Sequence, residues 1–367
     1  MIPVAKPSVG EQELEEVRKV FQSGWLGMGA WVKQFEDELK NFIGAKFVIA
    51  TNTGTSAIHL ALVCCGIKNG DEVIVPSLTF AATIQAIVAT GAFPVFCDVQ
   101  PDTLNLAPAD VRKRITSKTK AVIPVHYRGY PCDMEEIQDI AEKNKLRIIQ
   151  DAAHAFGSKY KGKKIGSFGD ITCFSFDPIK IITCGEGGAI VTNDDDVART
   201  AEKGRILGIS RDTWSRYKHE RSWFYDVETI GFRYHMSNIN AAIGIVQMKK
   251  FDGFLKRRQD IVRIYDENLK HIEGIELLKA DYESMAPFCY IIRAEQRDDL
   301  MAYLKENGID TGIHYIPNHL QSYFSKYKAS LPVTEKIWNE ILTLPLYYEL
   351  KDEQVLMICE KIKDFYL

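Results

Sequence analysis

The feature that most constrains the fold is an alternation of short apolar runs with helical patterns between Lys46 and about Val191. Runs rich in β-branched residues, such as FVIAT, DEVIVP and FPVFCDV, are separated by the helical patterns GTSAIHLALVCCG and TFAATIQAIVATG. The series continues through KAVIPVHY, DMEEIQDIAEKNK and RIIQDAAHAFGS. This repetition predicts an α/β fold with a mostly parallel sheet between helices, in which ligands bind at the carboxyl ends of the strands.

The pattern changes after Asp194 to long helical segments, followed by a mixed region in which CYIIRA is a strand. Because 367 residues exceed the size at which a single core stops growing, we expect two domains. We place a large domain at residues 1–245, including a helical N-terminal segment, and a smaller α+β domain at residues 246–367. The long helical pattern that begins at Ser237 is expected to join them.

Composition excludes several classes of partner. The net charge of −3 provides no positive field for nucleic acid or an anionic membrane. No apolar run approaches the roughly 20 residues that a membrane-spanning helix needs. Because a positive field is absent, we expect a small-molecule substrate. The eight cysteines are scattered without a CxxC pair, which predicts reduced thiols and a cytoplasmic protein.

Lys180 lies between an apolar strand pattern and a glycine-rich turn, in the stretch FSFDPIKIITCGEGG. A lysine held near packed backbone loses proton affinity, since burial disfavours its charged form. The neutral amine can then attack an aldehyde. This position therefore predicts a catalytic amine and a carbonyl cofactor.

A phosphate site is indicated where a helix opens after the strand FVIAT. Gly54 permits close approach, the hydroxyls of Thr55 and Ser56 can donate, and a helix N-terminus offers unpaired N–H groups. An ordinary helix cap explains the same residues, because Ser and Thr are favoured there.

Two further segments could complete a site. Asp151 ends a strand pattern, where a carboxylate could keep a heteroaromatic nitrogen protonated; the alternative is a helix cap at Asp151 and a satisfied core histidine at His154. Ser175 could donate to the same phosphate, although the glycines at 185–188 also fit a plain hairpin turn. With Lys180, these are the parts of a pyridoxal 5'-phosphate site. The remaining histidines match no zinc spacing, so we expect no metal.

The motifs TNTGTSAIHLAL, VPSLTFAATIQAI, GAFPVFCDVQPDTLNL, QDAAHAFGSKYKGKKIGSFGDITCFSF and LTLPLY resemble the DegT/DnrJ/StrS family of sugar aminotransferases along nearly the whole chain. The resemblance implies the fold-type I architecture of pyridoxal-phosphate enzymes. It also implies site residues. Lys180 would bond to the cofactor, Asp151 would pair with its pyridine nitrogen, His154 would neighbour its ring hydroxyl and Phe80 would stack on the ring. The phosphate would be bound by Gly54, Thr55, Ser56 and Ser175, and the substrate would be faced by His319 and Tyr315.

One segment departs from the family pattern. Where many members read GYNYRM, this chain reads GFRYHM at residues 231–236, with Arg233 and His235 at the changed positions. In the family this segment reaches the cofactor phosphate or substrate of a neighbouring subunit. The resemblance therefore implies a homodimer with shared active sites, with Arg233 toward the cofactor and His235 toward the substrate.

The function implied is transfer of an amino group from L-glutamate or L-glutamine to a ketone, foremost a nucleotide-linked keto sugar. Three alternatives stay open: a small phosphorylated ketone as acceptor, a sugar dehydratase that uses pyridoxamine phosphate, and a non-catalytic regulatory homologue. Dehydratases of this fold characteristically carry histidine at the lysine position, so Lys180 disfavours the second.

Overall fold

The computed structural model describes residues 1–209 and 225–367. A seven-stranded sheet with the order β1-β9-β8-β5-β4-β2-β3 forms its centre. All neighbouring strands are parallel except at β9, which runs antiparallel to both β1 and β8. The predicted α/β fold with a mostly parallel sheet between helices is therefore confirmed.

The strands of this sheet follow the apolar runs of the sequence. Their bounds are β1 Phe47–Thr51, β2 Glu72–Pro76, β3 Phe93–Cys97, β4 Thr119–Val122, β5 Arg147–Asp151, β8 Ile171–Ser175 and β9 Gly188–Thr192. The helices packed with it are α1 Glu11–Ser23, α2 Ala30–Ile43, α3 Gly54–Cys64, α4 Ala81–Ala89, α5 Pro108–Arg114, α6 Met134–Asn144 and α7 Asp195–Gly204. A short hairpin of β6 Lys159–Tyr160 and β7 Lys163–Lys164, and the 3-10 turn η1 Tyr127–Gly129, complete this part.

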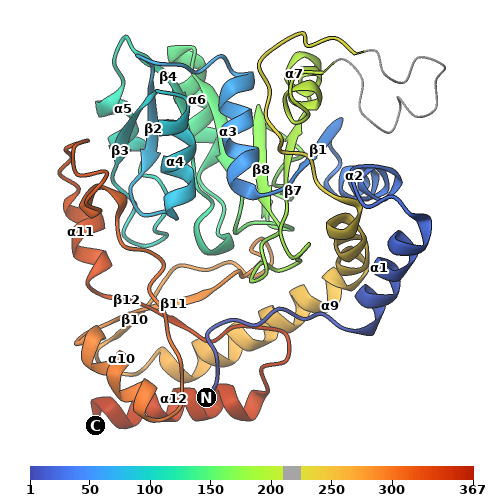
Figure 1. Ribbon diagram of the computed structural model, residues 1–367. Helices are drawn as coiled ribbons and strands as arrows, with labels where there is room; N and C mark the ends of the chain where they lie inside the picture. The colour runs from blue at the N-terminus through green and yellow to red at the C-terminus, as the bar shows by residue number, and fades with distance from the viewer. Residues whose placement is uncertain (210–224) are drawn as a thin grey trace.

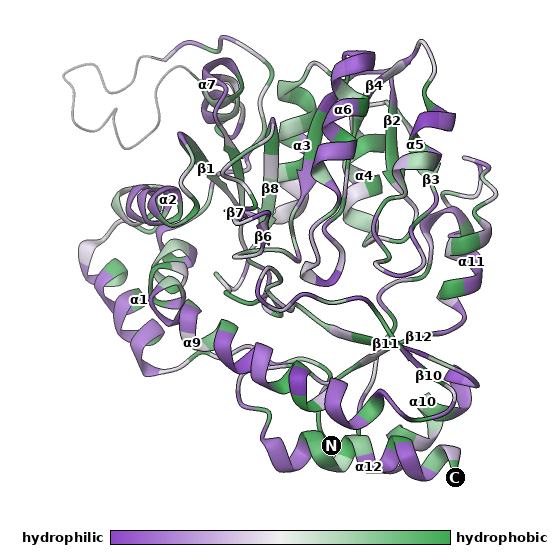
Figure 2. Cartoon of the chain, turned by 180° about the vertical axis from the view of Figure 1, so that it is seen from behind, coloured by the Kyte–Doolittle hydropathy of each residue, from purple (hydrophilic) through white to green (hydrophobic). Residues whose placement is uncertain are grey.

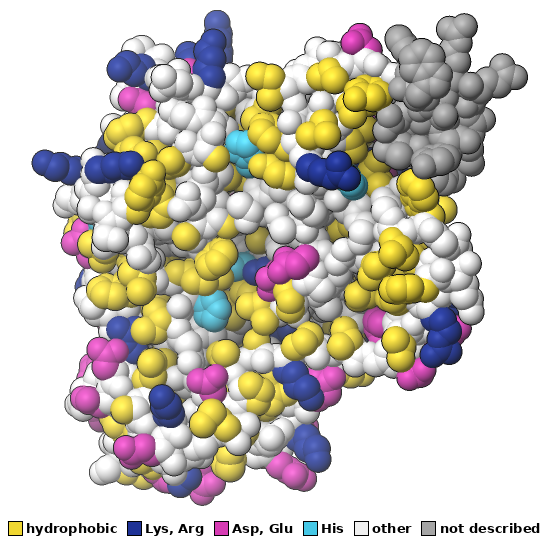
Figure 3. Space-filling view, in the orientation of Figure 1, with side chains coloured by type: hydrophobic (Ala, Val, Ile, Leu, Met, Phe, Trp, Pro, Cys, Tyr) yellow, Lys and Arg dark blue, Asp and Glu magenta, His cyan; other side chains and the backbone are white. Residues whose placement is uncertain are grey.

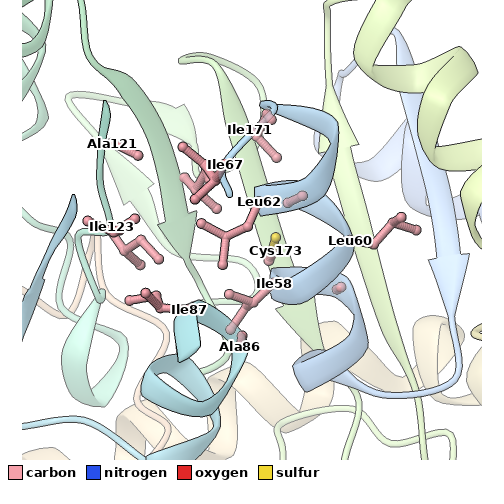
Figure 4. Close-up of a cluster of buried hydrophobic side chains, with 14 of the residues drawn as sticks. Ile58, Leu60, Leu62, Ile67, Ala86, Ile87, Ala121, Ile123, Ile171 and Cys173 are labelled. Carbon is pink, nitrogen blue, oxygen red and sulfur yellow. The ribbon is translucent and has the colours of Figure 1, made fainter. Parts of the chain in front are cut away.

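Both faces of the sheet are covered because its strands are apolar on both sides. On one face Ile49 and Ile190 pack with α3, α4 and α7; on the other, Val48 and Val191 pack with α2. Helices α5 and α6 cover the second face at the other end of the sheet. Figure 4 shows Ile58 of α3 within the first of these clusters.

A smaller sheet of β10 Ile275–Leu277, β11 Tyr290–Ala294 and β12 Ile341–Leu344 is antiparallel throughout. It lies with α10 Arg297–Glu306 and α12 Asp352–Tyr366 below the large sheet in Figure 1, where both termini are also found. The connection from α10 to β12 contains η2 Asn318–Leu320 and α11 Pro332–Trp338. Figure 2 shows hydrophilic stretches along α1 and α12, as expected for helices with one side in water.

The long helix α9, Asn238–Leu269, contributes to both parts of the molecule. Its first half packs against α2 through Ala241 and Ile245, whereas Ile261 and Tyr265 pack with the small sheet. Ile2 also belongs to the cluster of the small sheet. The division of the chain near residue 245 stays a prediction.

The parallel strands bring the polar residues of interest to one edge of the sheet. Asp151 ends β5, Ser175 ends β8, and Gly54 opens α3 directly after β1.

No helix among residues 1–209 and 225–367 is long and apolar enough to cross a membrane. The same part of the chain has no group of three or more His, Cys, Asp or Glu side chains that could hold a metal ion.

Candidate active site

A cavity of about 350 Å³ opens at the carboxyl ends of β5 and β8. In Figure 3, histidine, basic and acidic side chains meet in a hollow near the centre of this face, with hydrophobic side chains around it. Eight of the residues singled out from the sequence line the cavity: Gly54, Thr55, Phe80, Asp151, His154, Ser175, Lys180 and Tyr315. The structure thus brings together most of the candidate site from distant parts of the chain.

Lys180 lies on the cavity wall, in the loop between β8 and β9. Its Nζ lies 4.2 Å from the centre of the Phe288 ring, a contact that holds the amine against an apolar surface. Burial lowers the pKa of Lys180, and the carboxylates of Asp177 and Asp151 oppose that shift. The geometry therefore favours a readily deprotonated amine facing a cavity.

Asp151 is 4% exposed and is held by two hydrogen bonds. The hydroxyl of Thr83 donates to its Oδ2 at 2.7 Å, and the Ala153 backbone N–H donates to its Oδ1 at 3.1 Å. Burial raises the pKa of Asp151, while these two hydrogen bonds and Lys180 lower it. A carboxylate so placed can hold a positively charged ring nitrogen.

His154 is stacked on Phe288, with ring centres 4.1 Å apart and planes 13° apart. Its Nε2 is 3.0 Å from the hydroxyl of Tyr315, and its buried Nδ1 has no hydrogen-bond partner among the described residues. Burial, with Lys180 and His314 nearby, holds the pKa of His154 well below its usual range, so the ring is neutral at pH 7. A buried ring nitrogen without a partner in a cavity wall is available to a ligand.

The opposite end of the cavity is built from glycine and hydroxyl residues. A Cβ added to Gly54 would lie 2.7 Å from the Cβ of Ser175, and one added to Gly188 would lie 2.3 Å from the carbonyl oxygen of Thr53. Gly54 thus lets the start of α3 approach the end of β8 closely, and Gly188 lets the start of β9 approach the Thr53 carbonyl. The hydroxyls of Thr55 and Ser175 and the N-terminus of α3 therefore face the same space, as an anion requires.

Ser56 has a different place from the one expected. Its hydroxyl bonds to the side chain of Asn52 and to the backbone of Thr53, and its N–H donates to the Thr53 hydroxyl. Ser56 thus forms a capping box with Thr53 and does not line the cavity. The cap alternative describes Ser56, whereas Thr55 points to the cavity.

His319 does not line the cavity either. Its Nδ1 is 2.7 Å from the Ser77 hydroxyl and its Nε2 is 3.2 Å from Glu335, so both ring nitrogens are engaged inside the protein. His319 therefore does not face the cavity of its own chain, and its role toward substrate stays a prediction. Tyr315, four residues earlier, does line it, with its ring centre 5.4 Å from that of Phe80.

Arg233 and His235 also lie outside the cavity. The segment runs beside the end of β1, where His235 pairs with Thr51 and the Tyr234 carbonyl accepts the Asn52 N–H at 2.7 Å. Arg233 is exposed. The two residues are thus close in the fold to the start of α3 but do not contribute to the cavity of their own chain.

Some polar residues that line the cavity were given no role in the cofactor site predicted from the sequence. They include Thr79, Thr83, Asp177, Glu186 and His314, the last of which was considered only as a metal ligand. His314 lies two positions after Gly312, which bridges to Thr343 of β12, and burial together with Lys180 lowers the pKa of His314 to about 4. Its position beside Tyr315 in the motif HYIPNHL was the one available signal.

The residues present fit pyridoxal phosphate, a group that the structure does not contain. They include an amine for its aldehyde, a carboxylate for its ring nitrogen, an unpartnered His154 Nδ1 and a glycine-lined cradle for its phosphate. Fold and site together define a transferase that depends on pyridoxal phosphate.

Comparison with known proteins gives the family. Residues 7–363 match the model of the DegT/DnrJ/EryC1/StrS aminotransferase family, and the chain belongs to this family. It is 38% identical to the spore coat polysaccharide biosynthesis protein SpsC of Bacillus subtilis, with 99% of this chain and 96% of that protein covered. It is also 38% identical to the GDP-perosamine synthase of Escherichia coli O157:H7, with 100% and 98% covered.

Among solved structures, the aminotransferase TlmJ from Streptoalloteichus hindustanus superimposes with a TM-score of 0.92 at 34% identity, and the match covers 99% of this chain and 98% of that one. The sequence-based resemblance is therefore confirmed, and the protein is an aminotransferase.

Proposed function

We propose that this protein transfers an amino group from L-glutamate or L-glutamine to the carbonyl carbon of a nucleotide-linked keto sugar. The observation that carries the proposal is the meeting of Lys180, Asp151 and the glycine-lined phosphate cradle in one cavity. Two relatives support the acceptor class: one is named for GDP-perosamine synthesis and the other for polysaccharide biosynthesis. We further propose a cytoplasmic location, in keeping with eight free cysteines.

When bound, pyridoxal phosphate supplies a ring that accepts electron density from the carbon losing its proton. The neutral Nζ of Lys180 would take the proton from the α-carbon of the amino donor as a general base. Its protonated form would later give a proton, as a general acid, to the acceptor carbon that receives the amino group. The Asp151 carboxylate holds the proton on the ring nitrogen, which stabilises the charge that develops. Phe288, against which Lys180 lies, keeps the amine out of water.

We propose that a second copy of the chain completes the site. Within residues 1–209 and 225–367, Lys180 is the single lysine or arginine that lines the cavity, and Asp177 and Glu186 bring negative charge to the same space. A phosphate and a glutamate carboxylate both need cations, and His154 and His314 are neutral at pH 7. Arg233 is exposed and lies two positions before His235, which pairs with Thr51 at the end of β1. Arg233 is the candidate to reach the cofactor phosphate of a neighbouring subunit, with His235 toward its substrate.

The alternatives remain distinguishable. A small phosphorylated ketone would use the same amino-donor step and differ only in acceptor. A dehydratase that uses pyridoxamine phosphate would remove a hydroxyl group without transferring nitrogen, and it has no need of the amine at Lys180. A regulatory homologue would bind ligand without turnover. The retention of Lys180 with Asp151 in one cavity favours the aminotransferase over these last two.

The test traces the transferred nitrogen atom with an isotopic label. Protein loaded with pyridoxal phosphate is incubated with glutamate carrying isotopically labelled nitrogen, and then with a panel of 3-keto and 4-keto nucleotide sugars and phosphorylated ketones. Mass spectrometry of the acceptor is expected to show the label in an amino sugar. Label in a phosphorylated ketone alone would overturn the keto-sugar assignment. No change in the cofactor spectrum on addition of either amino donor would overturn the aminotransferase mechanism itself.

A further inference from the structure

We propose that Thr83 is a positioning residue for Asp151, and that its hydroxyl keeps the carboxylate ionised and oriented toward the cofactor ring nitrogen. The proposal rests on the proposed function, because it assumes that Asp151 faces that nitrogen. Thr83 lies in the first turn of α4, 68 positions before Asp151 in the sequence. Its role comes from the fold and not from a local motif.

The carboxylate of Asp151 is divided between two fixed donors. Oδ2 accepts the hydroxyl of Thr83 at 2.7 Å and Oδ1 accepts the N–H of Ala153 at 3.1 Å. Thr83 is 1% exposed and Asp151 is 4% exposed, so water does not replace either donor readily. With one bond to each oxygen, the carboxylate cannot rotate without losing both bonds, and free lone pairs remain for a ligand in the cavity.

The chemistry of the pair sets the direction of the next hydrogen bond. An ionised carboxylate has no hydrogen to give, so Thr83 must donate its single hydroxyl hydrogen to Asp151. The Thr83 oxygen can then only accept, and the hydroxyl of Thr79, 3.0 Å away, must donate to it. The two hydroxyls thus form a chain polarised toward Asp151, which strengthens the bond that reaches the carboxylate.

The far end of this chain is anchored by the C-terminal part of the molecule. The side-chain amide of Asn318 donates to the carbonyl oxygens of Ser77 and Thr79 at 3.0 and 2.7 Å. The backbone N–H of His319 donates to the Ser77 hydroxyl at 3.0 Å. These contacts fix the loop that carries Thr79. Asn318 and His319, both buried, therefore help to hold the hydrogen-bonded chain that ends at Asp151.

The ionisable groups around Asp151 cannot replace Thr83 as a partner that stays the same during the reaction. Lys180 is the cation that lowers its pKa, but the Nζ of Lys180 gains and loses a proton in the proposed reaction. Cys132 and Cys173 are neutral because burial raises the pKa of each thiol, and burial likewise keeps Tyr315 in its neutral form. Thr83 and the Ala153 N–H are therefore the donors that stay the same throughout a reaction cycle.

The experiment compares Thr83→Val, which keeps the shape and removes the hydroxyl, with Thr83→Ser, which keeps the hydroxyl. Thr90→Val is the matched control, because Thr90 caps the end of the same helix and its hydroxyl is bonded to the Ile87 carbonyl and the Ala92 N–H. The dissociation constant of pyridoxal phosphate is measured by equilibrium dialysis from pH 6 to 9, without any turnover. Lys180 titrates in every variant, so the comparison with the parent isolates Thr83.

Thr83→Val is expected to bind the cofactor about tenfold more weakly at pH 7, the scale of a hydrogen bond to a charged group. As the pH is lowered, cofactor binding by Thr83→Val should begin to weaken at a higher pH than binding by the parent. The reason is that Asp151, without the Thr83 donor, is protonated at a higher pH. Thr83→Ser and Thr90→Val should stay within about threefold of the parent. If Thr83→Val does not fold, Thr79→Val carries the same test with a smaller expected loss.

Two outcomes overturn the proposal: parental binding and pH response in Thr83→Val, or an equal loss in Thr83→Ser, which would assign the effect to shape. Asp151→Asn separates this proposal from the function on which it rests. If Asp151→Asn weakens cofactor binding and Thr83→Val does not, only the role of Thr83 fails. If Asp151→Asn binds as well as the parent, the assignment of Asp151 fails first.

Discussion

At the scale of single residues, Lys180 carries the chemistry, and its removal is the most direct test. Lys180→Ala is expected to lower the rate of amino transfer by about a thousandfold or more, because the proton transfer then has no positioned amine. The absorbance of the bound cofactor should also change, since its aldehyde loses its covalent partner. Lys163→Ala is the control, because Lys163 is exposed on the short β6–β7 hairpin. Transfer at the parental rate in Lys180→Ala would refute the assignment.

The same lysine predicts how the stability of the apoprotein depends on pH. Burial lowers the pKa of Lys180 in the folded state below its ordinary value of 10.5, so the unfolded chain binds more protons between these two values. Stability contributed by this site must then rise with pH through that window, and the buried charge costs most at lower pH. We expect apo Lys180→Met to melt above the parent at pH 7 and the difference to shrink toward pH 10. A variant that melts below the parent at pH 7 would contradict the lowered pKa.

At the scale of elements, a buried ion pair connects helix α2, strand β1 and the end of helix α7. Glu36 on α2 accepts the backbone N–H of Ala50 on β1 at 2.9 Å and the guanidinium of Arg205 after α7. Glu36→Gln leaves Arg205 buried with no opposite charge, so we expect a loss of about 3 kcal/mol in the free energy of unfolding. Urea unfolding of the apoprotein measures it.

The matched control lies one position along the same helix. Asp37 pairs with Lys33 at 2.8 Å on the exposed side of α2, and Asp37→Asn should change the free energy of unfolding by less than about 0.5 kcal/mol. Equal losses in the two variants would mean that burial does not decide the strength of this ion pair.

Elements also explain which parts of the site could be predicted from the sequence. Thr55, Asp151 and Ser175 stand at the ends of strands or the start of a helix, where the β/α rule places ligands, and the cavity contains all three. Thr83 and His319 depend on contacts between segments far apart in the chain, with 68 positions to Asp151 and 242 to Ser77. No local pattern encodes such a contact, so a buried anchor such as His319 looks like a substrate residue in the sequence.

At the scale of the whole molecule, the first residues and the last helices share one cluster. Ile2 exchanges backbone hydrogen bonds with Gly308 and Asp310, although more than 300 positions separate them in the numbering. Helix α9 then continues from the large sheet into this cluster. The cavity lies between the two parts, since Lys180 comes from one and His314 from the connection to β12. The shape of the cavity therefore depends on how these two parts of the molecule are placed relative to each other.

In the proposed dimer, Lys180 and Arg233 of the same active site would come from different copies of the chain, and this arrangement can be tested by mixing variants. Lys180→Ala and Arg233→Ala should each be nearly inactive alone. When the two are unfolded together and refolded as an equal mixture, half of the dimers are mixed, and one of the two sites in each mixed dimer has both residues intact. Activity is expected to return to about a quarter of the parental value. If each chain instead completes its own site, the mixture will show no more activity than the mean of the two variants, and Arg233 will have no role across an interface.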